Sequence, residues 1–137
     1  MPKLEYIIPC QQIIQDNQTN SMSYIGTIEG LIGKISPVTL PTIFIGLRWI
    51  KTKEPPESQI AFTARLRVID PDEKTISEIE PLEITMLKRR HRHNVVIHNL
   101  TFSKPGNYKI VVDEKRNGNW VDVGESIITF EVSAEEK

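Results

Sequence analysis

The fold is decided by the stretch Ile60-Ala-Phe-Thr-Ala-Arg-Leu-Arg-Val-Ile69, in which apolar and polar side chains alternate. Successive residues of a β-strand point to opposite faces of a sheet, so a period of two indicates a strand with one buried face. The predicted inner row is apolar and consists of Ile60, Phe62, Ala64, Leu66 and Val68. The predicted solvent-facing row contains Thr63, Arg65 and Arg67. This pattern is typical of an antiparallel sheet that covers a core with one face.

The same period recurs on both sides of this segment, and no stretch longer than about ten residues carries a helical apolar stripe. We predict seven or eight strands separated by turn signals, which is the pattern of an all-β, two-sheet antiparallel β-sandwich. The predicted strands are residues 4–14, 23–30, 43–50, 60–69, 75–87 with a break at Pro81, 95–100, 108–112 and 128–132. Residues 1–137 are expected to form one domain, with 133–137 as a frayed tail.

The turn Asp70-Pro-Asp-Glu-Lys74 also predicts a register. Proline presets φ, and aspartate side chains cap such turns. A four-residue loop sets Leu66 opposite Ile79 on the inner face. On the outer face it sets Arg67 opposite Glu78 and Arg65 opposite Glu80. A one-residue slip would exchange the two faces. We expect the two exposed ion pairs to select the register more than they stabilise it.

Composition excludes several classes of protein. The chain has 17 basic and 18 acidic residues and a net charge of -1, which argues against nucleic acid as the main partner. Its one cysteine, Cys10, excludes an intramolecular disulfide. The start of the chain has no signal-peptide pattern, and no apolar run approaches the roughly 20 residues that span a bilayer. We therefore expect a soluble, cytoplasmic protein without a membrane contact.

The local feature that stands out is residues 88–93, Lys-Arg-Arg-His-Arg-His, which we call the basic segment. One interpretation is an anion site formed by Arg89, Arg90, His91, Arg92 and His93, because arginine binds phosphate and carboxylate groups in a bidentate way. The other is a solvated loop or edge, where positive charge prevents aggregation between sheet edges. No glycine-rich phosphate loop accompanies the segment.

Other candidates for chemistry have simpler structural explanations. His91 and His93 share one face of a strand and His98 lies on the other, so we predict no metal site. Cys10 lies in an apolar strand, where a buried thiol is expected rather than a nucleophile. The alternating glutamates at 78, 80 and 83 fit a solvated face. We predict no catalytic residue and no cofactor.

The two tryptophans are expected to differ. Trp49 lies in the predicted inner row with Ile45 and Leu47, so it should belong to the core. Trp120 follows Asn117-Gly-Asn119 at a predicted hairpin and should be half-exposed. An exposed aromatic residue at the end of a sandwich can anchor an interface, so Trp120 is a candidate interface residue.

The chain resembles a family of uncharacterised small bacterial β-sandwich domains over nearly its whole length. The resemblance rests on Met1-Pro-Lys-Leu-Glu-Tyr-Ile-Ile8, Leu66-Arg-Val-Ile-Asp-Pro-Asp-Glu73 and the stretch 100–113. The last of these also looks like the closing strands of immunoglobulin-like sandwiches, with Pro105-Gly before an aromatic residue that starts a strand. The resemblance implies no activity, cofactor or catalytic residue.

With no reactive constellation in the sequence, we expect a non-catalytic domain that acts in protein–protein interaction or assembly. Edge strands of a sandwich are suited to strand addition or symmetric pairing. The alternative is binding of a small anion, phosphate or nucleotide, through the basic segment.

Overall fold

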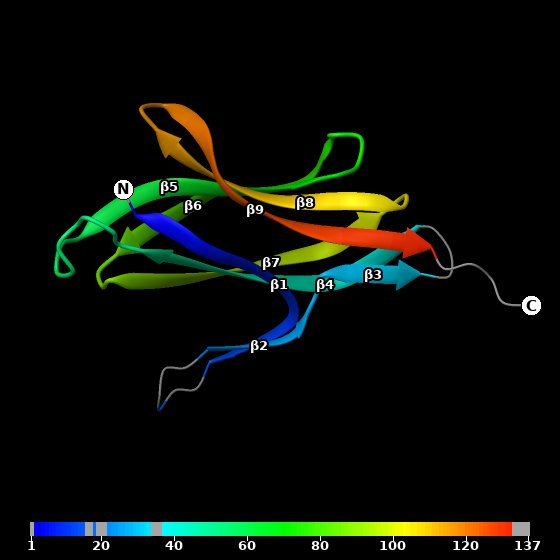
Figure 1. Cartoon of the computed structure of the whole chain (residues 1–137), viewed down its shortest axis with the longest axis horizontal. Helices are drawn as coiled ribbons and strands as arrows, with labels where there is room; N and C mark the ends of the chain where they lie inside the picture. The colour runs from blue at the N-terminus through cyan, green and yellow to red at the C-terminus, as the bar shows by residue number, and fades with distance from the viewer. Residues whose placement is uncertain (1, 16–17, 19–21, 34–36, 133–137) are drawn as a thin grey trace, which may run out of the picture.

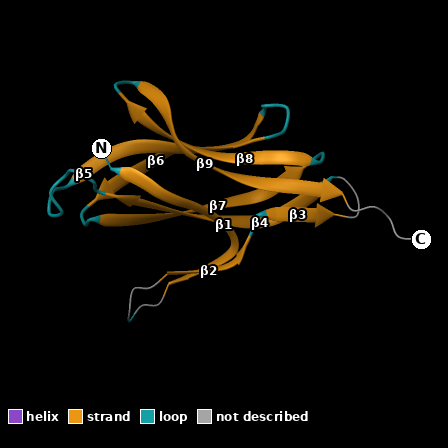
Figure 2. Cartoon of the chain, in the orientation of Figure 1, coloured by secondary structure: helices purple, strands orange, loops and turns teal. Residues whose placement is uncertain are grey.

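The computed structural model describes residues 2–15, 18, 22–33 and 37–132, and nine strands lie within them. Figure 1 shows their arrangement, and Figure 2 shows that strands and loops account for the described chain, with no helix. The bounds are β1 Lys3–Gln15, β2 Met22–Thr27, β3 Gly30–Gly33, β4 Val38–Ile50, β5 Ile60–Ile69, β6 Thr75–Met86, β7 Arg90–Phe102, β8 Gly106–Arg116 and β9 Asn119–Val132. The predicted all-β fold is confirmed.

The strands form two sheets that stack as a sandwich (Figure 1). The four-stranded sheet has the order β2-β1-β4-β7, and the five-stranded sheet has the order β3-β9-β8-β5-β6. Neighbours pair antiparallel except β3 and β9, which are parallel. The extra strand arises because the predicted strand 23–30 divides in two. The chain crosses from one sheet to the other at Ile28, whose amide donates to the carbonyl of Pro9 at 2.8 Å.

The inner faces of both sheets share one apolar core, as the alternation predicts. In β5, Ala64 and Leu66 are fully buried, and Val68 is 1% exposed. Trp49 is also fully buried in β4, which confirms its predicted place in the core. Burying each such aliphatic side chain contributes roughly 1.5–3 kcal/mol. The shared core therefore fixes which face of each strand meets solvent.

The predicted register of β5 and β6 is confirmed in the middle of β5, where Leu66 faces Ile79 and Arg67 faces Glu78. It shifts on both sides, between Val68 and Ile69 next to the turn and between Leu66 and Ala64 beside Pro81. β6 runs through Pro81 rather than breaking there. Asp70 caps the turn as expected, because its Oδ1 accepts from the amides of Asp72 and Lys74, each at 2.9 Å.

Of the two ion pairs expected across β5 and β6, the one between Arg65 and Glu80 is confirmed, and an aspartate of β8 binds both arginines at shorter distances. Asp113 of β8 lies opposite Arg65. Its Oδ2 accepts from the Nε of Arg65 at 2.7 Å and from that of Arg67 at 2.8 Å. Arg65 also lies 3.7 Å from Glu80. The prediction that Arg67 pairs with Glu78 is wrong, because a neighbouring strand supplies a more deeply buried carboxylate.

Two predicted turns are confirmed. The hydroxyl of Tyr108, whose side chain is fully buried, donates to the carbonyl of Lys104 at 2.8 Å and so closes the turn before β8. Asn117 and Gly118 both have positive φ at the β8–β9 hairpin. The likeness to immunoglobulin-like closing strands stays a prediction. The expected tail 133–137 and most of the expected turn 16–20 lie outside the described residues.

Candidate functional site

Two edge strands lie on the same side of the sandwich. β6 ends the five-stranded sheet and β7 ends the four-stranded sheet, and the chain passes directly from one to the other through residues 87–89. In Figure 1, β6 lies in one layer and β7 in the other, and the turn between them connects the two layers. We call this the open side. The basic segment, predicted as a loop or edge, begins in the turn and continues as the first residues of β7.

Alternate residues of β7 direct their main-chain groups toward the open side. The amide of Lys51 donates to the carbonyl of Arg89 at 2.8 Å, and the ladder with β4 continues with Trp49 opposite His91. In an antiparallel pair, residues that bond the neighbour alternate with residues that face away from it. The main-chain groups of Arg90, Arg92 and Asn94 therefore point away from β4.

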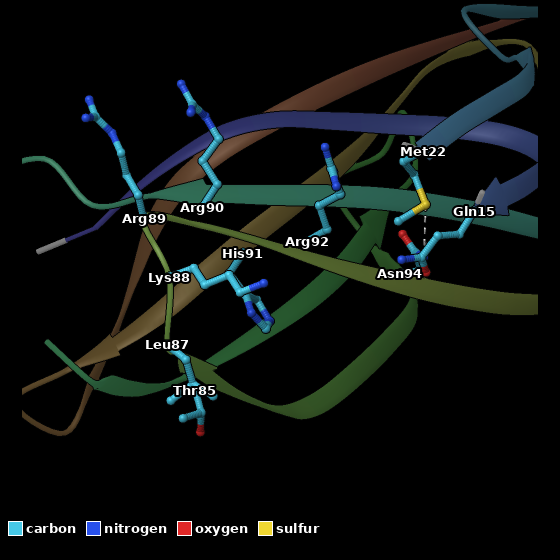
Figure 3. A pocket seen from close by; sticks show the side chains of 10 residues that line it. All are labelled: Gln15, Met22, Thr85, Leu87, Lys88, Arg89, Arg90, His91, Arg92 and Asn94. Atoms are coloured by element: carbon cyan, nitrogen blue, oxygen red, sulfur yellow. Dashed lines mark hydrogen bonds between the residues drawn. The ribbon is translucent and has the colours of Figure 1, made fainter. Parts of the chain in front are cut away.

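The side chains of the basic segment divide between two faces. Those of Arg90 and Arg92 are exposed on the outer face, and those of His91 and His93 are half-buried beneath the sheet. In Figure 3, Arg89, Arg90 and Arg92 extend to one side of the chain and His91 to the other. Sequence reasoning identified the charged cluster and placed His91 and His93 on one face of a strand, but it did not predict that this face is the half-buried one.

A hollow of about 600 Å³ follows the start of β7, and we call it the basic hollow (Figure 3). The turn and β7 line it with Leu87, Lys88, Arg89, Arg90, His91, Arg92 and Asn94. Thr85 of β6 and two residues of the β1–β2 hairpin, Gln15 and Met22, complete it. The hairpin reaches β7 where Asn94 Nδ2 lies 4.0 Å from Met22 Sδ. None of the described residues that line the hollow is acidic.

A carboxylate near the basic hollow, that of Glu5, is shared between two arginines. Glu5 lies 3.6 Å from Arg90 and accepts from Arg48 Nε at 2.7 Å. The Arg48 guanidinium also lies 4.9 Å from the centre of the Tyr6 ring. Because Glu5 is also engaged by Arg48 and Arg90 remains about half exposed, Glu5 neutralises the charge of Arg90 only in part.

Two tyrosines, Tyr6 and Tyr24, contact each other close to Arg48 and Arg92. The hydroxyls of Tyr6 and Tyr24 are 2.5 Å apart, and a side chain at Gly46 would collide with the Tyr24 ring. Burial raises the pKa of Tyr24, and its contact with Tyr6 adds to that effect. Tyr24 therefore stays a neutral hydroxyl beside Arg48 and Arg92. Gly46 is required here because the ring lies directly on the backbone.

The two histidines beneath β7 stack with their ring centres 6.1 Å apart. Burial lowers the pKa of His91, and burial together with the charge of His91 lowers the pKa of His93. Both are therefore neutral near pH 7. His91 lines the basic hollow and His93 does not. Among the described residues, no three His, Cys, Asp or Glu side chains form a group that could hold a metal ion.

The other singled-out residues lie away from the basic hollow. Trp120 is half-buried at the β8–β9 hairpin, with the Arg65 guanidinium 4.5 Å and the Lys115 ammonium 5.4 Å from its ring. This hairpin belongs to the five-stranded sheet, so the structure does not bring Trp120 together with the basic segment. Its role as an interface residue stays a prediction. Cys10 is fully buried, and burial raises the pKa of its thiol, as expected for a structural cysteine.

Sequence reasoning missed two buried carboxylates. Asp113 holds Arg65 and Arg67, and Glu114 accepts from Trp49 Nε1 at 2.8 Å and from Arg116 Nη2 at 3.0 Å. Both follow the apolar run Ile110-Val-Val112 inside β8. Acidic residues that continue such a strand could have indicated buried partners, because buried charges are paired.

Within the described chain, the structure has no helix with the length and hydrophobicity needed to cross a membrane. A comparison with curated proteins finds no match to this sequence. A protein-family model does match, over residues 5–118, which cover most of β1, all of β2 to β8 and therefore every residue that lines the basic hollow. The chain belongs to DUF6941, a family of unknown function.

Proposed function

We propose that this protein is a non-catalytic interaction module that takes up an acidic, extended protein segment along the open edge of β7. The observation that carries the proposal is the basic hollow. Four cations, Lys88, Arg89, Arg90 and Arg92, line a hollow that follows the edge strand β7, and no described lining residue is acidic. A strand added there would receive affinity from the main chain and specificity from charge.

The chemistry of the edge defines the partner. Side chains that lie directly opposite one another on neighbouring antiparallel strands have Cβ atoms roughly 4.5–5.5 Å apart. Arg90 and Arg92 are two residues apart on one face, so they match acidic residues at alternate positions of the added segment. Non-catalytic action and a reducing, cytoplasmic setting are part of the proposal, supported by a sequence without a nucleophile–base motif and by its single cysteine, which is buried.

The test measures binding of a synthetic peptide in which glutamate alternates with valine. We expect binding that weakens as salt increases and that is lost in the triple variant Arg89→Ala, Arg90→Ala, Arg92→Ala. The matched control, Lys3→Ala, Lys53→Ala, Lys109→Ala, removes the same charge elsewhere and should retain binding. Methylating alternate peptide amides removes main-chain donors without altering charge, so it should abolish strand addition.

The alternative is a small anion, and the size of the hollow favours it. A volume of about 600 Å³ lies within the usual range for small-molecule sites. Inorganic phosphate, pyrophosphate and a nucleotide would then raise the melting temperature of the wild type and not of the triple variant. Binding of phosphate but not of the peptide would establish this alternative. Binding of neither would show that the arginines only protect the edge from aggregation.

A further inference from the structure

Four strands lie at the ends of the two sheets in the described chain, and three of them carry features that discourage pairing with another chain. Pro81 and exposed glutamates lie along β6, and exposed arginines lie along β7. In β2, Gly26 has a φ of 67°, and the Gln11 side chain lies where its Cβ atom would be. The fourth, β3, has the sequence Gly30-Leu-Ile-Gly33, without charge, proline or positive φ.

The main chain of β3 is bonded to a neighbouring strand on one side. β3 runs parallel to β9, and the amide of Thr129 donates to the carbonyl of Glu29 at 3.2 Å. Because alternate residues of a strand bond the same neighbour, Leu31 makes the next bonds to β9. The main-chain groups of Gly30 and Ile32 therefore point away from β9. No described strand pairs with that side of β3.

The two central side chains of β3 point to opposite faces. Leu31 packs against the core and lies opposite Phe130, which is 1% exposed. Ile32 points to the outer face with 75% of its surface exposed, the largest fraction among the large apolar side chains that the structure describes. An uncharged apolar strand edge is a template for pairing with another strand.

We propose that two copies of this chain pair through β3 in antiparallel orientation, so that their five-stranded sheets join. A two-fold axis perpendicular to the joined sheet passes between the two Leu31 residues. It keeps the inner faces of both copies on the same side of the sheet. The same edge serves both copies, so the assembly closes as a dimer. This edge is separate from the basic hollow, and the inference goes beyond the proposed function.

The main chain of β3 suits this register. Gly30 of each copy lies opposite Ile32 of the other, and these are the residues whose main-chain groups point toward the edge. Each such pair exchanges two N–H···O bonds. On the outer face, the exposed side chain of Ile32 lies beside Gly30 of the second copy, which has no side chain to obstruct it.

The side chains also favour a second copy as the partner. On the inner face, Leu31 meets Leu31 of the second copy, and a residue equivalent to Phe130 lies beyond each of them, so the row is apolar throughout. On the outer face, Glu131 lies opposite Ile32 within each copy. The glutamates of the two copies therefore lie in different rows, and no like charges meet. An axis at Ile32 would instead set Leu31 against Gly33 and leave the inner row unfilled.

A cysteine at the two-fold axis tests the register. The two Leu31 positions form a non-hydrogen-bonded pair with Cα atoms roughly 4.5 Å apart, a separation that a disulfide accommodates. We expect Leu31→Cys to form a covalent dimer in a glutathione redox buffer. The native Cys10 is buried and should not react. Ile25→Cys, on the edge strand β2, is the matched control and should form covalent dimer at least about tenfold more slowly. Equal rates for the two variants would refute the β3 contact.

Sedimentation velocity on the full chain tests the contact without a disulfide. Because each copy contributes a strand of four residues, we expect a weak, reversible dimer. Ile32→Pro removes an amide on the free side of β3 and should lower the association constant by about tenfold or more. Ile32→Lys adds a like charge to both copies and should do the same without altering the main chain. Ile25→Lys is its control and should leave the dimer unchanged.

Denaturant unfolding of Ile32→Lys confirms that the variant is folded, because its side chain is exposed in the monomer. A wild type that stays monomeric at every concentration, or a folded Ile32→Lys variant that associates as the wild type does, would overturn the dimer. Salt separates this inference from the proposed function. The apolar β3 contact should keep its strength as salt increases, whereas binding of the acidic peptide should weaken.

Discussion

Two arginine pairs with the same spacing have different surroundings in this molecule. Arg65 and Arg67 lie on the inner strand β5, with 20% and 23% of their side chains exposed, and both bind Asp113, which is 3% exposed. Arg90 and Arg92 lie on the edge strand β7, and Arg90 has 51% of its side chain exposed, with a carboxylate at 3.6 Å. The comparison teaches that position within the sheet decides whether an Arg-x-Arg pair is held by a buried carboxylate or stays at an exposed edge.

The largest expected effect comes from removing the carboxylate between the first pair. Asp113→Ala leaves two largely buried guanidinium groups without their main partner, and we expect it to lower the free energy of unfolding by about 3 kcal/mol. Denaturant unfolding measures this. The control is Asp72→Ala, whose carboxylate pairs with Lys104 at the surface and should contribute less than about 1 kcal/mol. Equal losses in the two variants would contradict the assigned role of Asp113.

Replacing each arginine pair in turn should give a smaller difference in the free energy of unfolding. Arg65→Ala with Arg67→Ala leaves Asp113 buried without a counter-charge and exposes Trp120, so we expect a loss of about 2 kcal/mol. Arg90→Ala with Arg92→Ala should change stability by less than about 0.5 kcal/mol. The same unfolding assay applies to both. If the β7 pair proved as important for stability as the β5 pair, it would be structural rather than available for binding.

The smallest expected effect is on the pH dependence of stability. It comes from His91 and His93, which lie on the opposite face of β7 from Arg90 and Arg92. Burial lowers the pKa values of His91 and His93 in the folded chain below the ordinary value of 6.5. As pH falls through that value, the unfolded chain binds protons before the folded chain does, so stability falls with it. We expect the free energy of unfolding to decline between about pH 7 and pH 5.

Replacing both histidines by glutamine removes the titrating groups and should flatten this decline. His98→Gln is the control, because it removes a histidine that lies outside the basic hollow. Protonation of His91 also adds positive charge beside the hollow, so an acidic peptide should bind more tightly as pH falls. An unchanged pH slope in the double variant would show that other groups cause the loss of stability.

Much of the fold was predictable because its signals are local. The alternation in residues 60–69 identifies the inner face, and Pro105-Gly before Tyr108 identifies the corner that the Lys104 carbonyl closes. The register at Leu66 and Arg67 followed from the length of one turn. It is wrong on both sides of these residues, next to the turn and beside Pro81, because such shifts depend on how β6 fits its neighbour. The division of residues 23–30 was missed because the crossover of Ile28 depends on the second sheet.

The basic segment was also recognisable in the sequence as a local run of charge, but its structural role was not. Whether residues 88–93 form a solvated loop, a strand edge or an anion site depends on which strands lie beside them. The structure places them at a strand edge, next to a hairpin from residues far earlier in the chain. Asp113 shows the same dependence, since 46 residues separate it from Arg67.

The sequence by itself determined an all-β chain, the inner rows of its strands, its turns and one cluster of positive charge. Each of these depends on side-chain direction or backbone preference within a few residues. Only the tertiary structure decided the strand order, and with it which arginines meet Asp113 and which face the open side. Strand order depends on pairings between distant segments, and no local pattern specifies them.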